Sequence, residues 1–391
     1  MIFDKKKRIA ILGATGSIGR QTLDVVRQHA DEIEIVALSA HSSVRELIMA
    51  AHEFHVDHIA FSSKDVKDNP GLMDMPSHAT VGIGHEALLD IVHLPEVDIV
   101  VNALVGAAGL RASYETLKLG KVLALANKES LVVGGDILMP LTGGLKELLL
   151  PVDSEHSAIF QCLEGEDHFD IYRIWLTASG GPFFGKKFEE LEDITPMDAL
   201  AHPNWSMGNK ISIDSATLVN KGLEAIEAKH LFNIDFEQIK IVIQRQSAIH
   251  SMVEFQDGSI KAHLGATDMR IPIQYALSYP NRWETPAERV DFAQIAHLDF
   301  YDPDYQAFPA LSAVLEAGKK GGTLPAAMNA ANEVAVNYFL KTQIGFNDIA
   351  RVVTHAVEHN SADTVESIDQ LEAVDKAARL QAQEFIRKLM R

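Results

Sequence analysis

Seven residues near the start of the chain, Gly13-Ala14-Thr15-Gly16-Ser17-Ile18-Gly19, constrain its fold more than any other segment. They follow an apolar run at 8–12 and precede a segment with helical periodicity. Glycines at this spacing allow a tight turn, let a pyrophosphate approach the backbone and let the helix pack closely on the sheet. The loop therefore predicts dinucleotide binding at a helix N-terminus. The alternative is a glycine turn that binds no ligand.

The first 150 residues alternate between short apolar runs and helix-like segments. The runs lie at 8–12, 33–38, 58–61, 97–103 and 122–126, and the helical patterns lie near 17–29, 43–54, 84–93, 108–119 and 136–149. Runs rich in Ile, Val, Leu and Ala are typical of strands that are buried on both faces. Their alternation with helices predicts a parallel, doubly wound sheet, so we expect an α/β, Rossmann-like domain over 1–150.

The pattern changes after residue 150. Strands are predicted at 173–177 and 240–244, a hairpin at 251–255 and 259–264 around Asp257-Gly258, and helices at 216–232, 326–340 and 373–390. We therefore expect an α+β central catalytic domain over 151–285. An acidic, proline-containing linker would follow at 286–311, and an all-α C-terminal helical bundle would occupy 312–391.

Charge and composition exclude several classes of protein. The 391 residues carry a formal net charge of −19, which disfavours nucleic acid and anionic membranes as partners. The single cysteine, Cys162, excludes an internal disulfide and cysteine-rich metal sites. No apolar run reaches the roughly 18 residues of a membrane span. The expectation is a cytoplasmic enzyme.

The end of the second predicted strand bears on the choice of nicotinamide cofactor. Proteins that bind NAD usually carry a carboxylate there for the ribose 2′-hydroxyl. This chain has Ser39-Ala40-His41-Ser42-Ser43, with Arg45 close behind. Hydroxyl, imidazole and guanidinium groups suit a 2′-phosphate, which favours NADPH. The alternative is that these residues only cap the helix that follows.

Two carboxylates follow the apolar segment that ends near residue 150. Asp153 and Glu155 are two residues apart, so in extended backbone their side chains would point the same way. Carboxylates aimed at one point repel each other unless a cation lies between them, and Mg²⁺ or Mn²⁺ is the natural one. The alternative is helix capping and ordinary surface charge.

Polar side chains also gather around residues 177–224. Ser179 follows a predicted strand and precedes two glycines, while Asn220, Lys221 and Glu224 fall within about one helical turn, with Ser215 expected near the helix start. Such a set suits a phosphorylated polyol beside a metal ion. The alternative is a capped helix with a solvated ion pair. Lys128 lies at the predicted carboxyl edge of the parallel sheet, where ligands bind, and His202, Trp205 and Gly208 share one loop.

These segments together resemble the 1-deoxy-D-xylulose 5-phosphate reductoisomerase family. The likeness rests on 13–19, 126–130, 151–157, 179–183, 202–208, 214–225, 268–272 and 325–333, and it covers nearly the whole chain. It implies a homodimer that uses NADPH and Mg²⁺ or Mn²⁺ to rearrange and then reduce a phosphorylated ketose, 1-deoxy-D-xylulose 5-phosphate, to 2-C-methyl-D-erythritol 4-phosphate in isoprenoid synthesis.

The resemblance also implies roles for individual residues. Metal ligands would be Asp153, Glu155 and Glu224. Substrate contacts would be Lys128, Ser154, Glu155, Ser179, His202, Ser215, Asn220, Lys221 and Glu224, with Lys128, Glu155, His202 and Trp205 as catalytic candidates. Cofactor contacts would be Gly13, Thr15, Gly16, Ser17, Ile18, Ala40, Ser42, Asn127, Glu129, Met207, Gly208 and Met269.

The chain departs from the family at one position of interest. His41-Ser42-Ser43 stands where the family often has Gly-Lys-Asn, so a cation expected near the 2′-phosphate is missing, and His41 or Arg45 would have to replace it. Two other functions remain open from the residues alone. One is an NADP-dependent dehydrogenase of another small substrate, and the other is a non-catalytic NADP-binding sensor.

Overall fold

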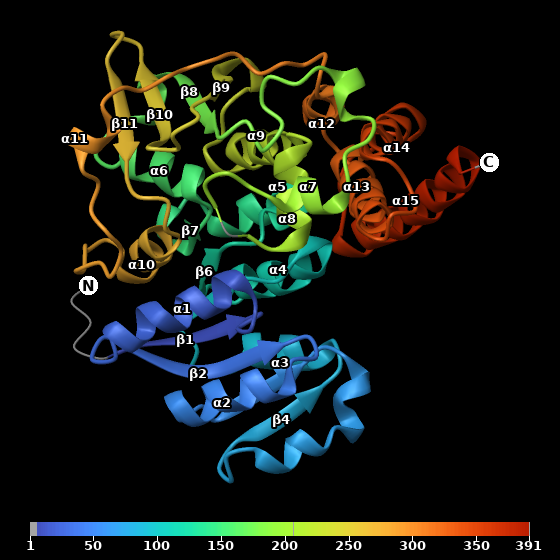
Figure 1. The fold of residues 1–391 in the computed structure, drawn as a ribbon. Helices are drawn as coiled ribbons and strands as arrows, with labels where there is room; N and C mark the ends of the chain where they lie inside the picture. The colour runs from blue at the N-terminus through green and yellow to red at the C-terminus, as the bar shows by residue number, and fades with distance from the viewer. Residues whose placement is uncertain (1–5, 206, 391) are drawn as a thin grey trace. The chain divides into compact units, whose positions relative to one another are not determined.

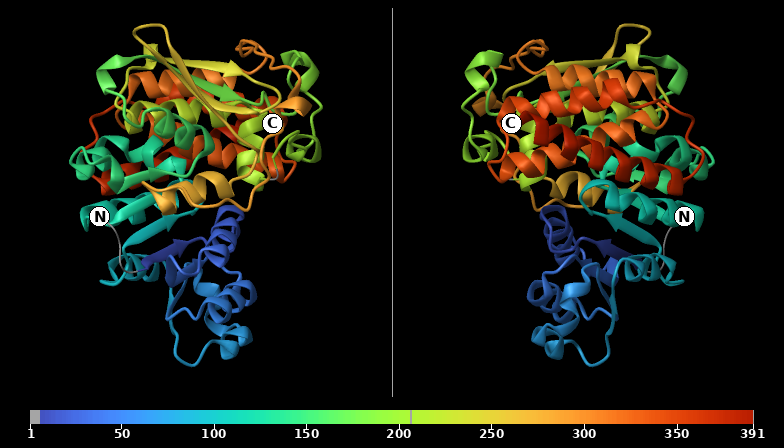
Figure 2. Two further views of the ribbon diagram at one scale, coloured as in Figure 1. Left: turned by 90° about the vertical axis from the view of Figure 1, so that its left-hand side faces the viewer. Right: turned by 90° about the vertical axis from the view of Figure 1, so that its right-hand side faces the viewer.

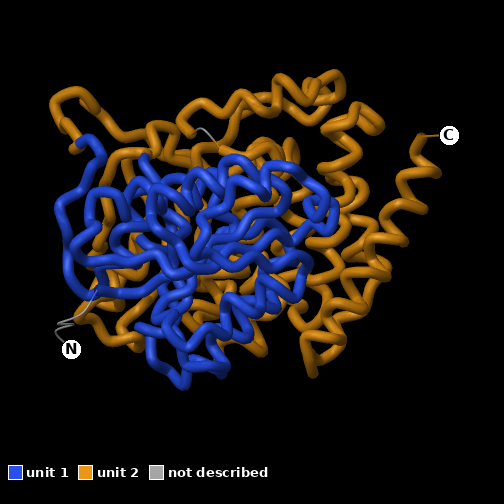
Figure 3. The backbone as a smooth tube through the Cα atoms, turned by 90° about the horizontal axis from the view of Figure 1, so that it is seen from below, with its two compact units in different colours: residues 1–127, 140–157, 268–288 blue, residues 128–139, 158–267, 289–391 orange. Residues whose placement is uncertain are grey.

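The computed structural model describes residues 6–205 and 207–390. The chain forms two compact units, each built from segments that are not consecutive in sequence (Figure 3). Unit 1 contains residues up to 127 together with 140–157 and 268–288, and unit 2 contains 128–139, 158–267 and the residues from 289 onward. The chain returns to unit 1 after it has entered unit 2, so these units are not consecutive segments and do not test the sequential boundaries predicted at 150, 285 and 311.

Unit 1 is built on a parallel sheet of seven strands in the order β4-β3-β2-β1-β5-β6-β7. The strands are β1 Lys7–Leu12, β2 Ile33–Ala40, β3 His58–Phe61, β4 Thr80–Ile83, β5 Ile99–Asn102, β6 Val122–Leu125 and β7 Leu149–Pro151. The helices between them are α1 Ser17–Gln28, α2 Val44–Phe54, α3 Glu86–His93 and α4 Leu110–Lys118 (Figure 1). The order reverses at β1, which places a ligand crevice at the carboxyl ends of β1 and β5. The predicted Rossmann-like sheet is confirmed.

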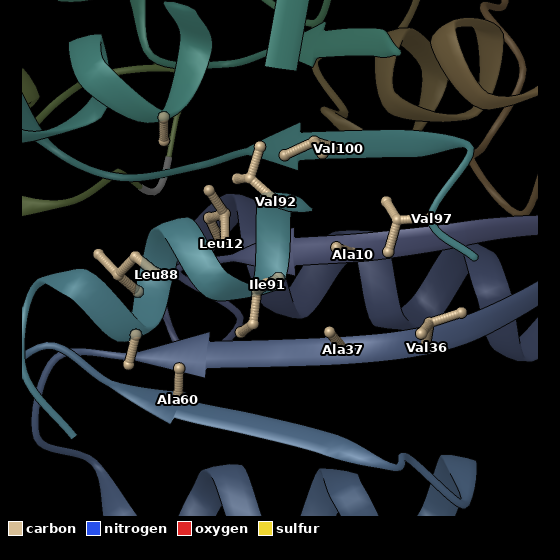
Figure 4. Packing of buried hydrophobic residues seen from close by; sticks show 12 residues of the cluster. Ala10, Leu12, Val36, Ala37, Ala60, Leu88, Ile91, Val92, Val97 and Val100 are labelled. Carbon is tan, nitrogen blue, oxygen red and sulfur yellow. The ribbon is translucent and has the colours of Figure 1, made fainter. Parts of the chain in front are cut away.

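The core of unit 1 forms where helix α3 covers the sheet. Figure 4 shows Leu88, Ile91 and Val92 of α3 packing toward alanines and valines of β1, β2, β3 and β5. Small side chains such as Ala10 and Ala37 on the strands let the helix approach closely. Helix α10, Arg270–Ser278, also belongs to unit 1 and packs on α1, although about 240 residues separate the two in sequence.

Unit 2 is built on a second sheet of four strands in the order β11-β10-β8-β9. The strands are β8 Ile171–Ala178, β9 Ile239–Ile243, β10 Ile249–Phe255 and β11 Ile260–Leu264. β8 pairs with β9 in parallel and with β10 in antiparallel fashion, and β10 and β11 form the predicted hairpin. The mixed α+β character that we predicted for this region is confirmed.

Helices make up the rest of unit 2. They are α5 Lys128–Leu138, α7 Pro196–Leu200, α8 Asn209–Ala216, α9 Val219–Leu231, α11 Phe292–Ile295, α12 Pro309–Lys320, α13 Leu324–Leu340, α14 Phe346–His359 and α15 Ile368–Leu389. Helices α12 to α15 pack on one another as the predicted C-terminal bundle (Figure 2). Helix α6, Ser154–Cys162, crosses the division between the units. Within the described residues, no helix is both long and apolar enough to cross a membrane.

Two local predictions were wrong, and one helix begins later than expected. The helix expected at 136–149 is instead the end of α5, two 3₁₀ turns at Met139–Thr142 and Lys146–Leu148, and the start of β7. The helix expected at 216–232 is confirmed as α9, but it begins at Val219, because Leu218 adopts a positive φ of 60° after α8 has ended at Ala216. Strand β4 was missed, because its Thr80–Ile83 sequence has neither a continuous apolar run nor burial on both faces.

Candidate active site

The glycine loop of unit 1 forms the predicted cradle. Gly13 has a φ of +84°, and a Cβ there would lie 2.7 Å from the carbonyl oxygen of Ala103. At Gly19 a Cβ would lie 2.3 Å from the Gly13 carbonyl oxygen, so both positions require glycine. Helix α1 begins at Ser17 without a side-chain cap on its first N–H groups. An uncapped helix N-terminus beside open backbone can bind a pyrophosphate. Thr15, Gly16 and Ile18 belong to this same turn.

The carboxyl end of β2 carries no acidic side chain. Ala40 is the last residue of the strand and is buried, whereas His41, Ser42 and Arg45 are exposed. His41 Nδ1 lies 2.9 Å from the Ser62 hydroxyl, which follows the neighbouring strand β3. An imidazole and a guanidinium are thus exposed just after the end of β2, and their role at a 2′-phosphate stays a prediction.

Asn127 ends unit 1 at the carboxyl side of β6 and is buried. Its amide donates to the carbonyl oxygens of Leu104 and Gly106 at 2.9 Å each. These bonds fix the loop after β5, next to the glycine loop that follows β1. Met269, another predicted cofactor contact, lies at the start of α10 in the same unit.

Asp153 and Glu155 lie in unit 1, but not on extended backbone as predicted. Asp153 caps the first turn of α6, since its Oδ1 accepts from the Glu155 N–H at 3.2 Å and its carbonyl accepts from the Ser157 N–H at 2.8 Å. Carboxylates are stabilised at a helix N-terminus by the free N–H groups and the helix dipole. The fully buried His156 donates from Nδ1 to Asp153 Oδ1 at 2.9 Å, and Ser154 donates to Glu155 Oε2 at 2.6 Å. Both carboxylates are thus held in place.

Glu224 is the centre of a buried polar group in unit 2. Its Oε1 accepts from Lys128 Nζ at 3.1 Å and from the Asn220 amide at 2.5 Å, and its Oε2 accepts from Lys221 Nζ. Both lysines and Glu224 are almost completely buried. A buried carboxylate needs such compensation. Asn220 Oδ1 is buried without a partner among the described residues, so this group can accept a further hydrogen bond from a ligand.

The turn that follows Ser179 packs against the backbone of Ser215 in unit 2. Ser179 starts a turn with Gly180 and Gly181, whose φ values are +77° and +66°. A Cβ on Gly181 would lie 2.8 Å from the carbonyl oxygen of Ser215, so this turn packs directly against the end of α8. The sequence placed Ser215 near a helix start, which was wrong: it is the penultimate residue of α8, and the break at Leu218 separates it from α9.

The loop between α7 and α8 holds His202 and Trp205, and its Ser206 lies outside the described residues. His202 Nδ1 accepts from the backbone N–H groups of Asn204 and Trp205 at 3.2 and 3.0 Å. Backbone N–H groups only donate, so the proton is on Nε2, which donates to the Ser179 hydroxyl at 3.0 Å. Burial and, secondarily, the Arg245 charge lower the pKa of His202 to about 4, which keeps the imidazole neutral.

The hydroxyl of Ser179 is left with its own proton to donate. Its oxygen accepts from His202 Nε2 and from the Gly181 N–H at 3.2 Å. A phosphate oxygen is the kind of acceptor that suits a hydroxyl oriented in this way.

Glu129 and the helix after Gly208 are joined by a lysine that sequence reasoning missed. Lys210 lies in the first turn of α8 and donates to Glu129 Oε1 at 2.7 Å, and its ammonium also lies 2.7 Å from Asp214 Oδ2. Burial would raise the pKa of Glu129, but the Lys210 charge and hydrogen bond outweigh it, and the pKa lies below its usual value. The two carboxylates hold the pKa of Lys210 above its ordinary value against burial. Gly208 is the N-cap of α8, and Met207 precedes it, half-buried.

Arg245 is a second residue that sequence reasoning missed. It follows β9, and Ser179 follows the parallel neighbour β8. Carboxyl ends of parallel strands meet at the same edge of a sheet, so this pairing brings Arg245 to Ser179, but the sequence did not show that the two predicted strands are neighbours.

The predicted residues thus fall into two groups. Unit 1 contains the glycine loop, Ala40, Ser42, Asn127, Asp153, Ser154, Glu155 and Met269. Unit 2 contains Lys128, Glu129, Ser179, His202, Trp205, Met207, Gly208, Ser215, Asn220, Lys221 and Glu224. Within unit 2 the structure brings Lys128, Lys221 and Asn220 to Glu224, and it brings His202 and Ser215 to the turn at Ser179.

Comparison with known proteins finds one family along almost the whole chain. The family model of 1-deoxy-D-xylulose 5-phosphate reductoisomerase matches residues 9–135, and the models of its two C-terminal domains match 149–232 and 264–381. The 1-deoxy-D-xylulose 5-phosphate reductoisomerase of Desulfitobacterium hafniense is 49% identical over 97% of this chain and 99% of its own. The Zymomonas mobilis enzyme is 44% identical over 98% of each chain.

Solved structures agree with this result. The Zymomonas mobilis reductoisomerase in complex with NADPH superposes with a TM-score of 0.90 at 42% identity, covering 98% of this chain and 99% of its own. A reductoisomerase in complex with NADPH, fosmidomycin and magnesium superposes with a TM-score of 0.93 at 40% identity and the same coverage. Similarity at this level, over nearly the full length of both chains, shows that this chain belongs to the 1-deoxy-D-xylulose 5-phosphate reductoisomerase family.

Proposed function

We propose that this chain catalyses the NADPH- and divalent-metal-dependent conversion of 1-deoxy-D-xylulose 5-phosphate to 2-C-methyl-D-erythritol 4-phosphate, a step of isoprenoid synthesis. The observation that carries the proposal is the arrangement in unit 2, where a turn suited to phosphate at Ser179 and Ser215 shares one unit with a buried carboxylate, Glu224, and its lysines. The reaction consumes one NADPH and one proton for each ketose that is rearranged and reduced.

The residues of unit 1 suit NADPH. The cradle at Gly13 would be filled by any Cβ, and the N–H groups at the start of α1 have no side-chain cap. When bound, the nicotinamide supplies a hydride to the aldehyde carbon formed by the rearrangement. Thr15, Gly16, Ser17 and Ile18 would hold the pyrophosphate. Ala40 and Ser42 would lie beside the adenosine ribose, Met207 and Met269 would lie near the nicotinamide, and Asn127, Glu129 and Gly208 would be further cofactor contacts.

Asp153, Glu155 and Glu224 suit a hard divalent cation, because each offers carboxylate oxygen. Such donors select Mg²⁺ or Mn²⁺ over softer metals. The ion, when bound, polarises the substrate carbonyl as a Lewis acid. Asp153 is fixed by its cap and by His156, and Glu155 by Ser154, so two of the three ligands are preoriented within unit 1.

The remaining side chains would bind and shield the substrate. Ser179, whose hydroxyl is oriented by His202, offers its proton to the phosphate, with Ser215, Asn220 and Lys221 as further phosphate ligands. Remote phosphate binding supplies energy that orients the reacting carbons. Trp205 on the loop would exclude water from the reactive enediolate. Lys128 and Ser154 would contact the carbon chain, and Lys128 or Glu155 would move the proton.

A direct assay tests the proposal. Purified protein is mixed with NADPH, Mn²⁺ and 1-deoxy-D-xylulose 5-phosphate, and the nicotinamide absorbance is followed with and without a chelator. We expect loss of NADPH that depends on the ketose and stops on chelation. Turnover that survives chelation would favour a dehydrogenase without rearrangement. Tight NADPH binding without any turnover would favour a sensor.

Assembly and location are further proposals. The family resemblance supports a homodimer, and the acidic composition with a single cysteine supports a cytoplasmic location. Size-exclusion chromatography with light scattering would give twice the 42.9 kDa chain mass if the dimer forms. Cell fractionation would test the location.

A further inference from the structure

Arg245 joins the two parts of the phosphate subsite in unit 2. Its Nη1 donates to the carbonyl oxygens of Ser179 and Gly181, the latter at 2.9 Å. The guanidinium therefore bridges two carbonyl groups of the turn that contains Gly180 and Gly181. Because a trans peptide directs its C=O and N–H in opposite directions, holding the Ser179 carbonyl turns the N–H of Gly180 away from the guanidinium. That leaves this N–H oriented for an acceptor on the other side of the turn.

The backbone of Arg245 holds the loop that carries His202. The side-chain amide of Asn204 donates to the Arg245 carbonyl oxygen at 2.8 Å and to the Ser247 hydroxyl at 2.7 Å. The Asn204 N–H donates to His202, and His202 donates to Ser179. The contacts form a closed ring from Arg245 through the loop and back to the turn. The turn at Ser179 and the loop that carries His202 would both contribute to phosphate binding, and Arg245 contacts both of them.

The side chain also contributes a fixed charge. The guanidinium lies 5.0 Å above the Phe184 ring, which restricts its orientation. It is close enough to His202 that its charge helps to lower the pKa of that imidazole. His202 is neutral, so it brings no cation of its own to the turn.

We propose that Arg245 is a positioning residue for the substrate phosphate, which shapes the turn at Ser179, fixes the His202 loop and adds a positive charge beside both. This rests on the proposed function, because it deepens the phosphate subsite of the same reaction. The guanidinium preorganises the turn through its hydrogen bonds and adds a positive charge near the bound phosphate, so we expect its loss to weaken phosphate binding by roughly 10- to 100-fold.

The test compares Arg245→Met, Arg245→Lys and the control Arg173→Met. Arg173 lies in β8 of the same unit, stacks on Trp175 and loses the same charge on substitution. Inorganic phosphate is titrated into each protein by calorimetry, NADPH is titrated by fluorescence, and KM and kcat are measured for 1-deoxy-D-xylulose 5-phosphate. Circular dichroism confirms that each variant is folded.

For Arg245→Met we expect phosphate binding to weaken and KM for the ketose phosphate to rise by about 10- to 100-fold. NADPH binding should stay within about twofold, as should every parameter of the control. Arg245→Lys keeps the charge without the fork of donors, so it should recover part of the phosphate affinity. If the methionine variant does not fold, the lysine variant carries the test and should bind phosphate at least about threefold more weakly than wild type.

Two results would overturn the inference. One is a folded Arg245 variant that binds phosphate as tightly as wild type. The other is a parallel loss of phosphate binding, NADPH binding and kcat, which would indicate a general structural role. Failure of the proposed function is separate: wild-type protein would then bind phosphate but consume no NADPH with the ketose phosphate.

Discussion

Replacing Lys210 with methionine should destabilise unit 2, and this loss of stability should become smaller at low pH. The ammonium lies 2.7 Å from carboxylate oxygens of both Glu129 and Asp214, whose side chains are only 8% and 1% exposed. At an effective dielectric constant of ~20, each pair is worth about 6 kcal/mol before desolvation is subtracted. Removing one partner of a buried ion pair costs about 3–5 kcal/mol. Because Lys210 is 17% exposed and Asn332 still donates to Asp214, we expect about 3 kcal/mol.

The assay is urea unfolding followed by circular dichroism at pH 7 and at lower pH. The pKa of Glu129 is lowered in the folded protein, so its contribution to stability is present above the ordinary carboxylate pKa and is lost as the pH falls. The difference between wild type and Lys210→Met should therefore hold from pH 7 down to about pH 4.5, the ordinary carboxylate value, and shrink as the pH falls further. The control is Lys240→Met, which breaks a 3.7 Å ion pair with the exposed Asp302 and should cost about 0–1 kcal/mol. A loss below about 1 kcal/mol at pH 7 for Lys210→Met, or a loss that grows in acid, would refute this reasoning.

Three further outcomes are expected. Glu224→Gln should lower kcat on the order of 100-fold or more, because the carboxylate is a proposed metal ligand. NADPH binding should stay within about twofold, because Glu224 does not lie in the unit that contains the glycine loop. Normal turnover would contradict this role. Gly13→Ala should weaken NADPH binding by about tenfold or more in a fluorescence titration, because its Cβ would lie 2.7 Å from Ala103 O at a φ of +84°, and wild-type affinity would sink the argument. NMR titration should show the His202 imidazole protonating near its pKa of about 4, below the ordinary value. Because the unfolded chain takes up this proton at a higher pH than the folded protein, the free energy of unfolding should decrease as the pH falls from 6.5 towards 4. A midpoint near 6.5 would show that the fold does not hold the ring neutral.

The sequence predicted the parts of the fold that local pattern determines. Strands such as β3, His58–Phe61, are short apolar runs between helices, and the structure matches the predicted bounds within a few residues. The glycine loop was recognised because Gly13 and Gly19 must lack a Cβ, a requirement that spacing alone conveys. The family resemblance then supplied the remaining site residues, and the comparisons confirmed the family.

The errors arose where tertiary structure overrides local pattern. The apolar segment near 131–152 contains a helix end, two 3₁₀ turns and a strand, and hydrophobicity does not distinguish them. The break at Leu218 has no glycine or proline to announce it, so Ser215 was placed at the wrong end of a helix. Arg245 and Lys210 each act through partners far away in sequence, which a reading of neighbouring residues does not reveal.

The divided composition of unit 1 has a consequence for synthesis on the ribosome. Lys7 of β1 donates to the carbonyl oxygens of Leu277 and Tyr279, and α1 packs on α10, so the unit is incomplete until its third segment, 268–288, is made. At about 5–20 residues per second, the 110 residues between 157 and 268 take roughly 6–22 s to translate. During that interval α1 exposes to the cell the surface that α10 later covers. A fragment ending at residue 150 keeps the same surface exposed permanently, and a stable cofactor-binding fragment would need 268–288 joined to it.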